Sequence, residues 1–413
     1  MNKRVMELKG VEVWDGNMAN SQAFRQADVD VVAAYPITPS TATVENYAMF
    51  HANGYVDGEV MMTESEHAAM SACVGAGAAG GRVATATSSQ GLALMIEVLY
   101  QASGMRIPVV LCLVNRALAA PLNVNGDHSD LYLTRDSGWI SIDAFNPQQA
   151  YDMTLMAFKI SEHPDVRLPV ISNQDGFMTS HTAQNVTPLP DEVACKFVGD
   201  YLQVNALLNF DKPVTHGVQT EQDWHFEHKA KQHAALMGSK KIILEVFKEF
   251  KELTGREYNL VETYNMENSE IAVVCLGTTF ETAMVAIEKL KAEGINAGVV
   301  APRVFRPFPL EEMAEALQGV KAIACMDRSA PGGTVGTLFN EISGALINTP
   351  NRPLVSNLIY GLGGRDMTVA GLKDIYRTLH KEAQEGKLSG KIQRFVGVRG
   401  PELSFYDAQG VQK

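Results

Sequence analysis

The chain has 413 residues, of which 46% are hydrophobic and 20% are charged, and its formal net charge is −12. At about 100–200 residues per domain, this composition predicts a folded protein with two or three hydrophobic cores and excludes a disordered chain. The acidic balance argues against nucleic acid and anionic membranes as partners, because both select clustered Lys and Arg.

The residues after Met1 do not lead into the apolar segment of a secretory signal, and no run of about 18 apolar residues could span a bilayer. We therefore expect a cytoplasmic protein. The cysteines are isolated and form no C-x-x-C pair, so we expect buried thiols and neither a metal nor an iron–sulfur cluster held by this chain alone. They are Cys73, Cys112, Cys195, Cys275 and Cys325.

The first part of the chain alternates apolar β-branched runs with helical patterns. Near-continuous apolar strands separated by helices predict a parallel sheet that is covered on both faces. The expected strands are 29–34, 83–87, 107–114 and 168–172, and the expected helices are 20–26, 65–79, 92–103 and 147–161.

The pattern changes from Asn205 to about residue 262, where a polar stretch contains several histidines and Trp224. Within this stretch, the pattern of residues 240–253 predicts an amphipathic helix with Lys and Glu on its solvent-facing side. We interpret this segment as a connector rather than a disordered tether, because it keeps aromatic and aliphatic side chains.

A second series of strands and helices follows the connector, and a short tail begins at Ser389. A Gly-rich turn covers 330–336, and a second loop covers 361–366. The expected strands are 271–277, 296–304, 320–326 and 354–360, and helices are expected at 280–293, after the Gly-rich turn, and up to about residue 385.

Polar side chains follow several of the predicted strands of the first series. Thr38 lies in a turn bracketed by Pro36 and Pro39, Glu66 begins a run of small residues, and Arg116 follows the most apolar strand. In α/β sheets, ligands bind at the carboxyl ends of the strands. These residues therefore predict one site at that edge.

These segments resemble the α subunit of the 2-oxoacid:ferredoxin oxidoreductases, the pyruvate synthase type above all. The resemblance extends over nearly the whole chain, with the motifs in the family's order and approximate spacing. The motifs are Tyr35-Pro36-Ile37-Thr38-Pro39-Ser40, Ser65-Glu66, Thr85-Ala86-Thr87-Ser88-Ser89-Gln90-Gly91-Leu92, Asn115-Arg116-Ala117 and Gly126-Asp127-His128-Ser129-Asp130.

The resemblance implies an α/β protein with two domains. Residues 1–262, including the connector 205–262, would form the pyrimidine-side thiamine diphosphate-binding domain with its parallel sheet. Residues 263–388 resemble the transketolase C-terminal-like domain, and residues 389–413 form the tail.

The resemblance also implies the activity, which is thiamine- and CoA-dependent oxidative decarboxylation of a 2-oxoacid, in anaerobic metabolism. Thiamine enzymes need a carboxylate that is hydrogen-bonded to the cofactor's aminopyrimidine ring, and by resemblance this catalytic residue is Glu66. Glu64 is a rival by position alone. The structural alternative for both is an acidic residue favoured by the dipole at a helix N-terminus.

Thr38 and Arg116 are the expected substrate-binding residues. The family uses the threonine hydroxyl close to the substrate's carboxylate or carbonyl, although a turn threonine is the structural alternative. Arg116 could hold the carboxylate of the 2-oxoacid with its guanidinium, or it could be an ordinary surface arginine after a strand.

The remaining candidates contact the cofactor or order a loop. By resemblance the cofactor contacts are Pro36, Ile37, Glu66, Ser88, Ser89 and Gln90, although the three polar residues could equally pack a subunit interface. Asn125, Asp127 and His128 form a candidate active-site loop, and one histidine between aspartates is a weak metal signal.

Two sequence motifs are absent. The chain contains no G-D-G that is followed by N-N about 25–30 residues later. This absence predicts that the Mg²⁺ and the diphosphate of the cofactor are bound by a β subunit. No G-x-G-x-x-G opens a helix after a strand, which disfavours a dinucleotide fold. The expected partners are that β subunit, γ and ferredoxin-like δ subunits with the iron–sulfur clusters, and ferredoxin or a flavin/NAD subunit as acceptor.

Pyruvate is the default substrate, but one departure from the pyruvate-type pattern leaves an alternative. Such subunits tend to carry Trp and Asn before the Asp-His, where this chain has Asn125 and Gly126. Small residues there could enlarge the pocket for an aromatic or branched 2-oxoacid such as phenylglyoxylate. A catalytically silent structural subunit and a transketolase-type transferase half also remain open.

Overall fold

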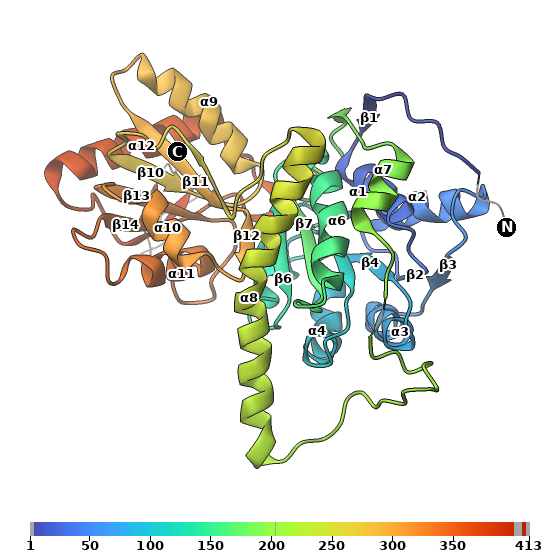
Figure 1. Ribbon diagram of the computed structural model, residues 1–413. Helices are drawn as coiled ribbons and strands as arrows, with labels where there is room; N and C mark the ends of the chain where they lie inside the picture. Colours follow the sequence, from blue (N-terminus) through green and yellow to red (C-terminus); the bar gives the residue numbers. More distant parts are fainter. Residues whose placement is uncertain (1–3, 203, 400–406, 410–413) are drawn as a thin grey trace. The chain divides into compact units, whose positions relative to one another are not determined.

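The computed structural model describes residues 4–202, 204–399 and 407–409 (Figure 1). By its contacts the chain divides into two units. Unit 1 takes the residues up to Val124, 130–258 and 305–307, and unit 2 takes 125–129, 259–304 and the residues from 308 onward. In this division the second segment of unit 1 ends at Tyr258.

Unit 1 is built around a sheet with the strand order β12-β6-β7-β5-β4-β2-β3, in which β2 to β7 pair in parallel. Every residue of β4, β5, β6 and β7 is buried. Successive strand residues point to opposite faces, so both faces of the sheet are covered. The strands are β2 Val31–Ala34, β3 Glu59–Met62, β4 Val83–Thr87, β5 Val110–Val114, β6 Ile140–Ala144, β7 Val170–Gln174 and β12 Val304–Arg306.

The helices of unit 1 pack in two groups, one containing α1, α2 and α6 and the other containing α3 and α4. A separate two-stranded ribbon pairs β1 with β8. The helices are α1 Gly16–Gln26, α2 Thr41–Ala52, α3 Glu66–Ala79, α4 Ser89–Gly104, α5 Ser129–Leu133, α6 Pro147–Glu162, α7 Asp191–Val198 and α8 Gln222–Thr254, and the ribbon strands are β1 Glu12–Trp14 and β8 Gln184–Val186.

Local signals in the sequence explain where these helices begin. Asn146 caps α6 by accepting a hydrogen bond from Gln149 N at 3.0 Å, and Pro147 occupies the first helical turn. Ser65 caps α3, which ends at Gly80 in the left-handed conformation.

Unit 2 contains a second sheet, with the order β16-β15-β14-β13-β10-β11-β9. All neighbours in it are parallel except β9, which runs antiparallel to β11. Its elements are β9 Val261–Tyr264, β10 Ile271–Val274, α9 Thr279–Lys291, β11 Ala297–Pro302, α10 Leu310–Ala316, β13 Ala322–Asp327, α11 Thr337–Leu346, β14 Leu354–Ile359, α12 Val369–Glu385, β15 Gln393–Val396 and β16 Asp407–Gln409.

The strands predicted for both series are present, and the expected α/β class with parallel sheets is confirmed. The helix predicted at 240–253 is the second half of α8, which begins 18 residues earlier, at Gln222. Four of the five cysteines are buried as expected, whereas Cys195 is exposed. No helix within the described residues has the length and apolar character needed to cross a membrane.

Candidate active site

Four neighbouring parallel strands of unit 1 end at the same edge of the sheet, in the order β3-β2-β4-β5. The chain that follows each of them carries predicted site residues. Glu66 follows β3, Thr38 follows β2, the segment 88–91 follows β4, and Arg116 follows β5. The fold therefore brings these four segments, which are spread over 79 residues of sequence, to one edge.

Glu66 is the first residue of α3, and its side chain is only 8% exposed. The preceding turn is fixed at two points. Ser65 Oγ accepts a hydrogen bond from Ala68 N at 3.2 Å, and Thr63 donates to Ala34 O through both its amide, at 3.0 Å, and its hydroxyl, at 3.2 Å. These bonds join the ends of β2 and β3, so the position of Glu66 is set by the sheet.

The Glu66 carboxylate lies against Gly91 in the first turn of α4. A Cβ added at Gly91 would lie 2.7 Å from Glu66 Oε1 and 2.4 Å from Thr87 Oγ1. The Glu66 carboxylate makes no hydrogen bond or ion pair with any residue that the structure describes. Neither carboxylate oxygen is among the fully buried atoms of the described residues, so this largely buried side chain keeps an open acceptor that a ligand at the edge of the sheet can use.

Several fully buried polar atoms on or after β4 and β5 also lack a partner among the described residues. They are Thr85 Oγ1 in the middle of β4, and Thr87 Oγ1, Ser88 Oγ and Asn115 Oδ1 at the carboxyl ends of β4 and β5. Buried polar groups are hydrogen-bonded in most native proteins. A polar ligand that reaches this edge would satisfy several of them, so the residues present fit the aminopyrimidine of thiamine.

Arg116 and Thr38 are in direct contact. The Arg116 side chain is largely buried, and its Nη1 donates to Thr38 O at 3.0 Å while its Nε donates to Asn123 O at 3.3 Å. The Thr38 side chain is exposed. These two carbonyls orient the guanidinium and leave its Nη2 without a hydrogen bond in the described part of the chain.

The other predicted cofactor contacts divide into exposed and buried positions. Pro36 is exposed and Ile37 is half-buried, whereas Ser88 and Ser89 are fully buried. Ser89 has a positive φ of 48°, and its hydroxyl oxygen lies 2.6 Å from Ala117 O and 2.5 Å from Gln90 Oε1, so that its one proton is donated to either acceptor. Ser89 thus joins the segment after β4 to the segment after β5. The Ser88 hydroxyl has no hydrogen-bond partner among the described residues.

Asp130 organises the backbone of this site. Its fully buried carboxylate accepts hydrogen bonds from Ser89 N, Arg116 N and Asn115 Nδ2, each at 2.9 Å. One carboxylate therefore joins the segments that follow β4 and β5. Sequence reasoning noticed Asp130 only as part of a motif and did not select it.

The structure assigns the candidate loop residues Asn125, Asp127 and His128 to unit 2. His128 N donates to Arg328 O at 2.7 Å, and Gly363 N donates to Asp127 Oδ2 at 3.2 Å. Asn125 is exposed and lies against Gly364. Within their own unit these residues order loops.

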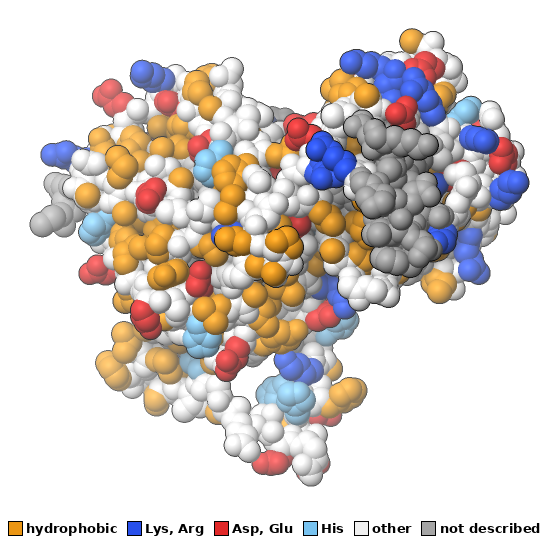
Figure 2. Space-filling model, turned by 180° about the vertical axis from the view of Figure 1, so that it is seen from behind, with side chains coloured by type: hydrophobic (Ala, Val, Ile, Leu, Met, Phe, Trp, Pro, Cys, Tyr) orange, Lys and Arg blue, Asp and Glu red, His pale blue; other side chains and the backbone are white. Residues whose placement is uncertain are grey.

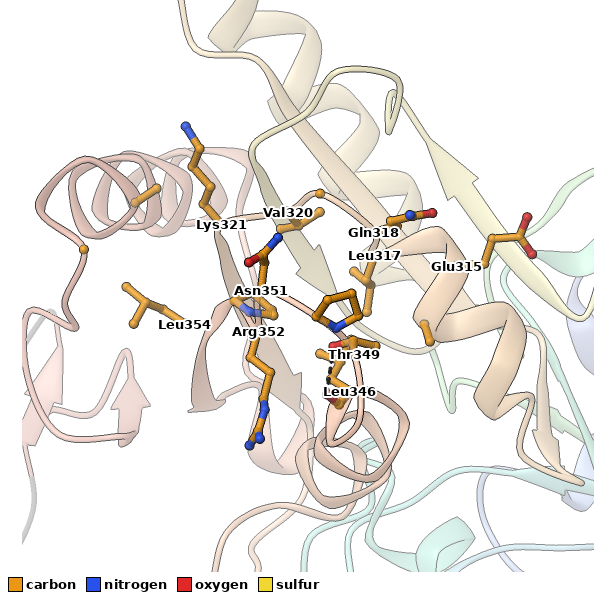
Figure 3. Close-up of a pocket in the computed structure, with 16 residues that line it drawn as sticks. Glu315, Leu317, Gln318, Val320, Lys321, Leu346, Thr349, Asn351, Arg352 and Leu354 are labelled. Carbon is orange, nitrogen blue, oxygen red and sulfur yellow. Dashed lines mark hydrogen bonds between the residues drawn. The ribbon is translucent and has the colours of Figure 1, made fainter.

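None of the cavities found among the described residues is lined by Thr38, Glu66 or Arg116. A cavity of about 820 Å³ in unit 2 opens at the amino ends of β13 and β14, opposite to the edge where parallel sheets bind ligands (Figure 3). The side chains of Lys321 and Arg352 at this cavity point away from each other. No group of three or more His, Cys, Asp or Glu in the described ranges is placed to hold a metal ion.

Two family models match the chain. "Pyruvate flavodoxin/ferredoxin oxidoreductase, thiamine diP-bdg" matches residues 22–248, and "Pyruvate:ferredoxin oxidoreductase core domain II" matches residues 269–372. The first model covers the segments of the candidate site.

Curated relatives match over nearly their full length. Pyruvate synthase subunit PorA of Thermotoga maritima is 44% identical over 96% of this chain and 100% of its own. PorA of Methanocaldococcus jannaschii is 43% identical, and ketoisovalerate oxidoreductase subunit VorA of Pyrococcus horikoshii is 42% identical, each over 92% of this chain and 97% of its own.

Solved structures share the fold at low sequence identity. The 2-oxoglutarate:ferredoxin oxidoreductase of Magnetococcus marinus superposes with a TM-score of 0.69 at 21% identity, over 92% of this chain and 66% of that chain. A split-gene transketolase superposes with a TM-score of 0.52 at 12% identity, over 90% and 99%.

Proposed function

Because this chain belongs to the pyruvate flavodoxin/ferredoxin oxidoreductase family, as an α subunit of the 2-oxoacid:ferredoxin oxidoreductases, we propose that it supplies the pyrimidine side of a shared thiamine diphosphate site. In this proposal the complex converts a 2-oxoacid and coenzyme A into acyl-CoA and CO2. Two electrons pass one at a time to iron–sulfur clusters in partner subunits. The α subunit is active only with those partners.

The observation that carries this proposal is the largely buried Glu66 side chain, whose carboxylate has no partner among the described residues. When bound, thiamine diphosphate supplies a carbon acid whose conjugate base attacks the 2-oxo carbon. Glu66 holds a proton at the pyrimidine ring nitrogen, and the orphaned hydroxyls of Thr87 and Ser88 offer further hydrogen bonds at the same edge. Pro36, Ile37 and Gln90 complete the cofactor contacts in this proposal.

Arg116 positions the carboxylate of the substrate, together with Thr38. Two carbonyls already fix its guanidinium, so little side-chain freedom is lost when the substrate binds. Decarboxylation removes the carboxylate charge that Arg116 binds. Strong binding of this charge would therefore stabilise the bound substrate more than the transition state. We therefore expect Arg116 to affect mainly KM.

The proposal needs a β subunit at the open edge of this site. Large exposed apolar side chains come from the same edge, from the end of β2, the end of β3 and the first turns of α4, which favours a protein partner there. They are Tyr35, Met61, Met62 and Leu94. The β subunit would grip the diphosphate and Mg²⁺, and γ and ferredoxin-like δ subunits would carry the clusters to ferredoxin or to a flavin/NAD subunit.

The substrate is pyruvate in the first instance. Pyruvate synthase and ketoisovalerate oxidoreductase subunits are almost equally similar to this chain, at 43–44% and 42% identity, so a branched or aromatic 2-oxoacid such as phenylglyoxylate is the second candidate. Steady-state kcat/KM of the purified complex on pyruvate, 2-oxoisovalerate and phenylglyoxylate decides between them. A strong pyruvate preference would exclude the enlarged pocket.

The test of the site is Glu66→Gln in the complete complex, which keeps the shape of the side chain and removes its charge. We expect assembly and thiamine diphosphate binding to persist, while deuterium exchange of the cofactor's acidic C–H and turnover fall by at least ~10²-fold. Glu64→Gln is the matched control, since Glu64 is an exposed carboxylate two residues away.

The same pair of variants separates the remaining alternatives. Near-normal turnover with Glu66→Gln would identify the chain as a catalytically silent structural subunit. Loss of turnover with Glu64→Gln but not with Glu66→Gln would move the catalytic role to the neighbouring residue. A purified complex that has the thiamine activity but no iron–sulfur subunits would favour a transketolase-type transferase half.

A further inference from the structure

The turn at residues 36–40, which carries Thr38, is held by side chains from two other parts of unit 1. Two successive carbonyls of the turn accept the hydrogen bonds. Thr38 O accepts from Arg116 Nη1 at 3.0 Å, and Pro39 O accepts from Asn17 Nδ2 at 2.9 Å. Asn17 belongs to α1, so the turn has a support from outside the four segments that form the candidate site.

The Asn17 side chain makes specific contacts because it is fully buried. Figure 2 shows charged side chains spread over the surface of the chain, where water completes their hydrogen bonds. A buried amide has to find its partners within the protein. Asn17 Nδ2 donates to Pro39 O, and Asn17 Oδ1 accepts from Thr43 Oγ1 at 2.9 Å. Since a carbonyl oxygen can only accept, Pro39 O fixes which end of the amide faces the turn.

The first turn of α1 is itself fixed in place. Gly16 N donates to Thr179 O at 2.9 Å, in the loop that follows β7. The Asp15 carboxylate caps the helix by accepting from Met18 N at 2.8 Å. Asn17 therefore starts from a backbone that is tied to the sheet, and its amide has little freedom to follow a displaced turn.

The loop after β7 also lies against the turn. A Cβ added at Gly176 would lie 2.0 Å from Asn115 O and 3.0 Å from Pro39 Cγ. Asn115 N donates to Gln174 O at 2.9 Å, at the end of β7. The segments that follow β2, β5 and β7 thus come into close contact at Pro39, where Asn17 donates its hydrogen bond.

Both expected substrate-binding residues depend on the position of this turn. A displaced turn would move the exposed Thr38 side chain and would also withdraw the carbonyl that orients the Arg116 guanidinium. Reacting groups that are misplaced by about 1 Å can lose activity about 10²-fold. Glu66 has separate supports, because the hydrogen bonds of Thr63 and Ser65 that fix its position do not involve α1.

On the basis of the function proposed above, we propose that Asn17 is a positioning residue for the 2-oxoacid. It fixes the turn at residues 36–40 through Pro39 O, and through this turn it orients Thr38 and Arg116. Asn17 itself does not contact the substrate. Its loss should therefore affect KM for the 2-oxoacid more than kcat, as is expected for Arg116.

The first experiment compares two buried asparagines of α1 in the complete complex. Asn17→Ala should raise KM for the 2-oxoacid about 10-fold and change kcat by less than about two-fold. Asn20→Ala is the matched control, because Asn20 is also buried but its Oδ1 accepts from Thr154 Oγ1 on α6, at 3.0 Å. Both variants should lower the melting temperature to a similar extent. An equal rise of KM in both would overturn the proposal, since general destabilisation of α1 would then explain it.

Hydrogen–deuterium exchange of the complex tests the turn without reference to activity. Ser40 N and Thr41 N donate to Ile37 O at 2.9 Å and 3.2 Å, so their amides report whether the turn is intact. Exchange in a peptide that contains both amides should be about 10-fold faster with Asn17→Ala and unchanged with Asn20→Ala. Unchanged exchange with Asn17→Ala would mean that Asn17 does not hold the turn.

Thr43→Val is a milder second variant, which serves if Asn17→Ala does not assemble. It keeps the bond to Pro39 O but leaves Asn17 Oδ1 without its donor. We expect KM and the exchange rate of the turn to rise about two- to three-fold, because the amide is then held at one end only. If neither value rises, the proposal is wrong.

Thr38→Val distinguishes failure of this proposal from failure of the proposed function. If Thr38→Val raises KM for the 2-oxoacid and Asn17→Ala does not, only the positioning role of Asn17 fails. If Thr38→Val and Asn17→Ala both leave KM unchanged, the substrate role of the turn fails in the proposed function, and the positioning role fails with it.

Discussion

Asp130 illustrates how one buried side chain can position several others. Its carboxylate accepts hydrogen bonds from Ser89 N, Arg116 N and Asn115 Nδ2, and it is fully buried. Asp130→Ala leaves these three donors and Leu131 N without their acceptor, at up to about 1–3 kcal/mol each. We expect a loss of about 3–5 kcal/mol in stability and a higher KM for the 2-oxoacid, because the backbone of Arg116 loses its anchor.

Chemical denaturation and steady-state kinetics on the folded fraction measure the two effects of Asp130→Ala separately. A purely structural role would reduce the amount of active protein without changing KM. Asp136→Ala is the control, because Asp136 is an exposed carboxylate paired only with its neighbour Arg135 among the described residues.

Gly91 is a glycine because the side chains of Thr87 and Glu66 approach its Cα closely, and not because its backbone has a positive φ. A Cβ at this position would lie 2.4 Å from Thr87 Oγ1, 2.7 Å from Glu66 Oε1 and 2.8 Å from Glu66 Cγ. We expect Gly91→Ala to displace the Glu66 carboxylate and to reduce kcat/KM by about 10²-fold, at a stability cost of about 1–3 kcal/mol. Steady-state kinetics with parallel thermal denaturation would test this.

Gly104→Ala is the matched control for Gly91→Ala. Gly104 ends the same helix, and no atom lies within 4 Å of an added Cβ there. This change should stabilise the helix slightly and leave activity unchanged. Equal activity of the two variants would contradict the role given to Gly91.

The sequence allowed the edge of the sheet and the residues that gather there to be predicted, but not the contacts between them. Thr38 and Arg116 each follow a predicted apolar strand, which is a local signal, whereas β3 before Glu66 was not predicted and Glu66 was selected by the run of small residues that it begins. The Glu66–Gly91 contact depends on how α3 and α4 pack, and no local pattern reports it. Asp130 was missed because its partners lie 14 to 41 residues away in the sequence.

At the scale of elements, the apolar strands of both sheets were predicted well, whereas strands with polar residues were missed. β6 reads Ile-Ser-Ile-Asp-Ala and resembles a half-exposed strand, but all five residues are buried, and Asp143 accepts a hydrogen bond from Asn173 on β7. The first half of α8 was missed for a different reason. Its exposed aromatic and histidine side chains lack the periodicity of a helix that packs on a core.

Asp327 at the end of β13 caps α11 from a distance. Its carboxylate accepts hydrogen bonds from Leu338 N at 2.8 Å, Phe339 N at 3.2 Å and Asn357 Nδ2 at 2.7 Å. Burial raises the pKa of Asp327 to about 6 from its ordinary value of 3.8, although these three donors oppose the shift. The folded state therefore binds its proton more tightly than the unfolded state does.

This pKa shift predicts a pH dependence for unit 2. The contribution of Asp327 to the free energy of unfolding is complete below about pH 4 and is lost as the pH rises through about 6, by at most about 3 kcal/mol. Asp327→Asn cannot release a proton, so its stability relative to the wild type should rise over that pH range. Denaturation at a series of pH values, with the exposed Asp366→Asn as control, measures it.

At the scale of the whole molecule, sequence neighbours do not always share a unit. Asp127 and Asp130 are three residues apart, yet Asp127 accepts from Gly363 N, 236 residues away, in unit 2, while Asp130 accepts from Ser89 N in unit 1. Tertiary contacts decide this division. The sequence predicted two α/β units because each carries its own series of apolar strands, but it could not assign a five-residue crossing such as 125–129.

The end of unit 1 is held by one buried cluster. Asp152 on α6 is fully buried and accepts hydrogen bonds from Arg256 Nε at 2.6 Å, Arg256 Nη2 at 2.9 Å and Tyr258 OH at 2.6 Å. These bonds fasten the chain that leaves α8, immediately before unit 2 begins. Burial raises the pKa of Asp152, and the Arg256 charge opposes this shift.

Arg256→Met should therefore destabilise unit 1 by about 3–5 kcal/mol at neutral pH, because it leaves a buried carboxylate without its counter-charge. The loss should shrink as the pH falls, since protonation of Asp152 removes the unpaired charge. Lys251→Met, which breaks the exposed pair with Glu257 at 2.7 Å, should cost less than about 1 kcal/mol at any pH. Calorimetry at neutral and acidic pH measures both variants, and equal losses would mean that burial of Asp152 does not govern how this end of unit 1 is held.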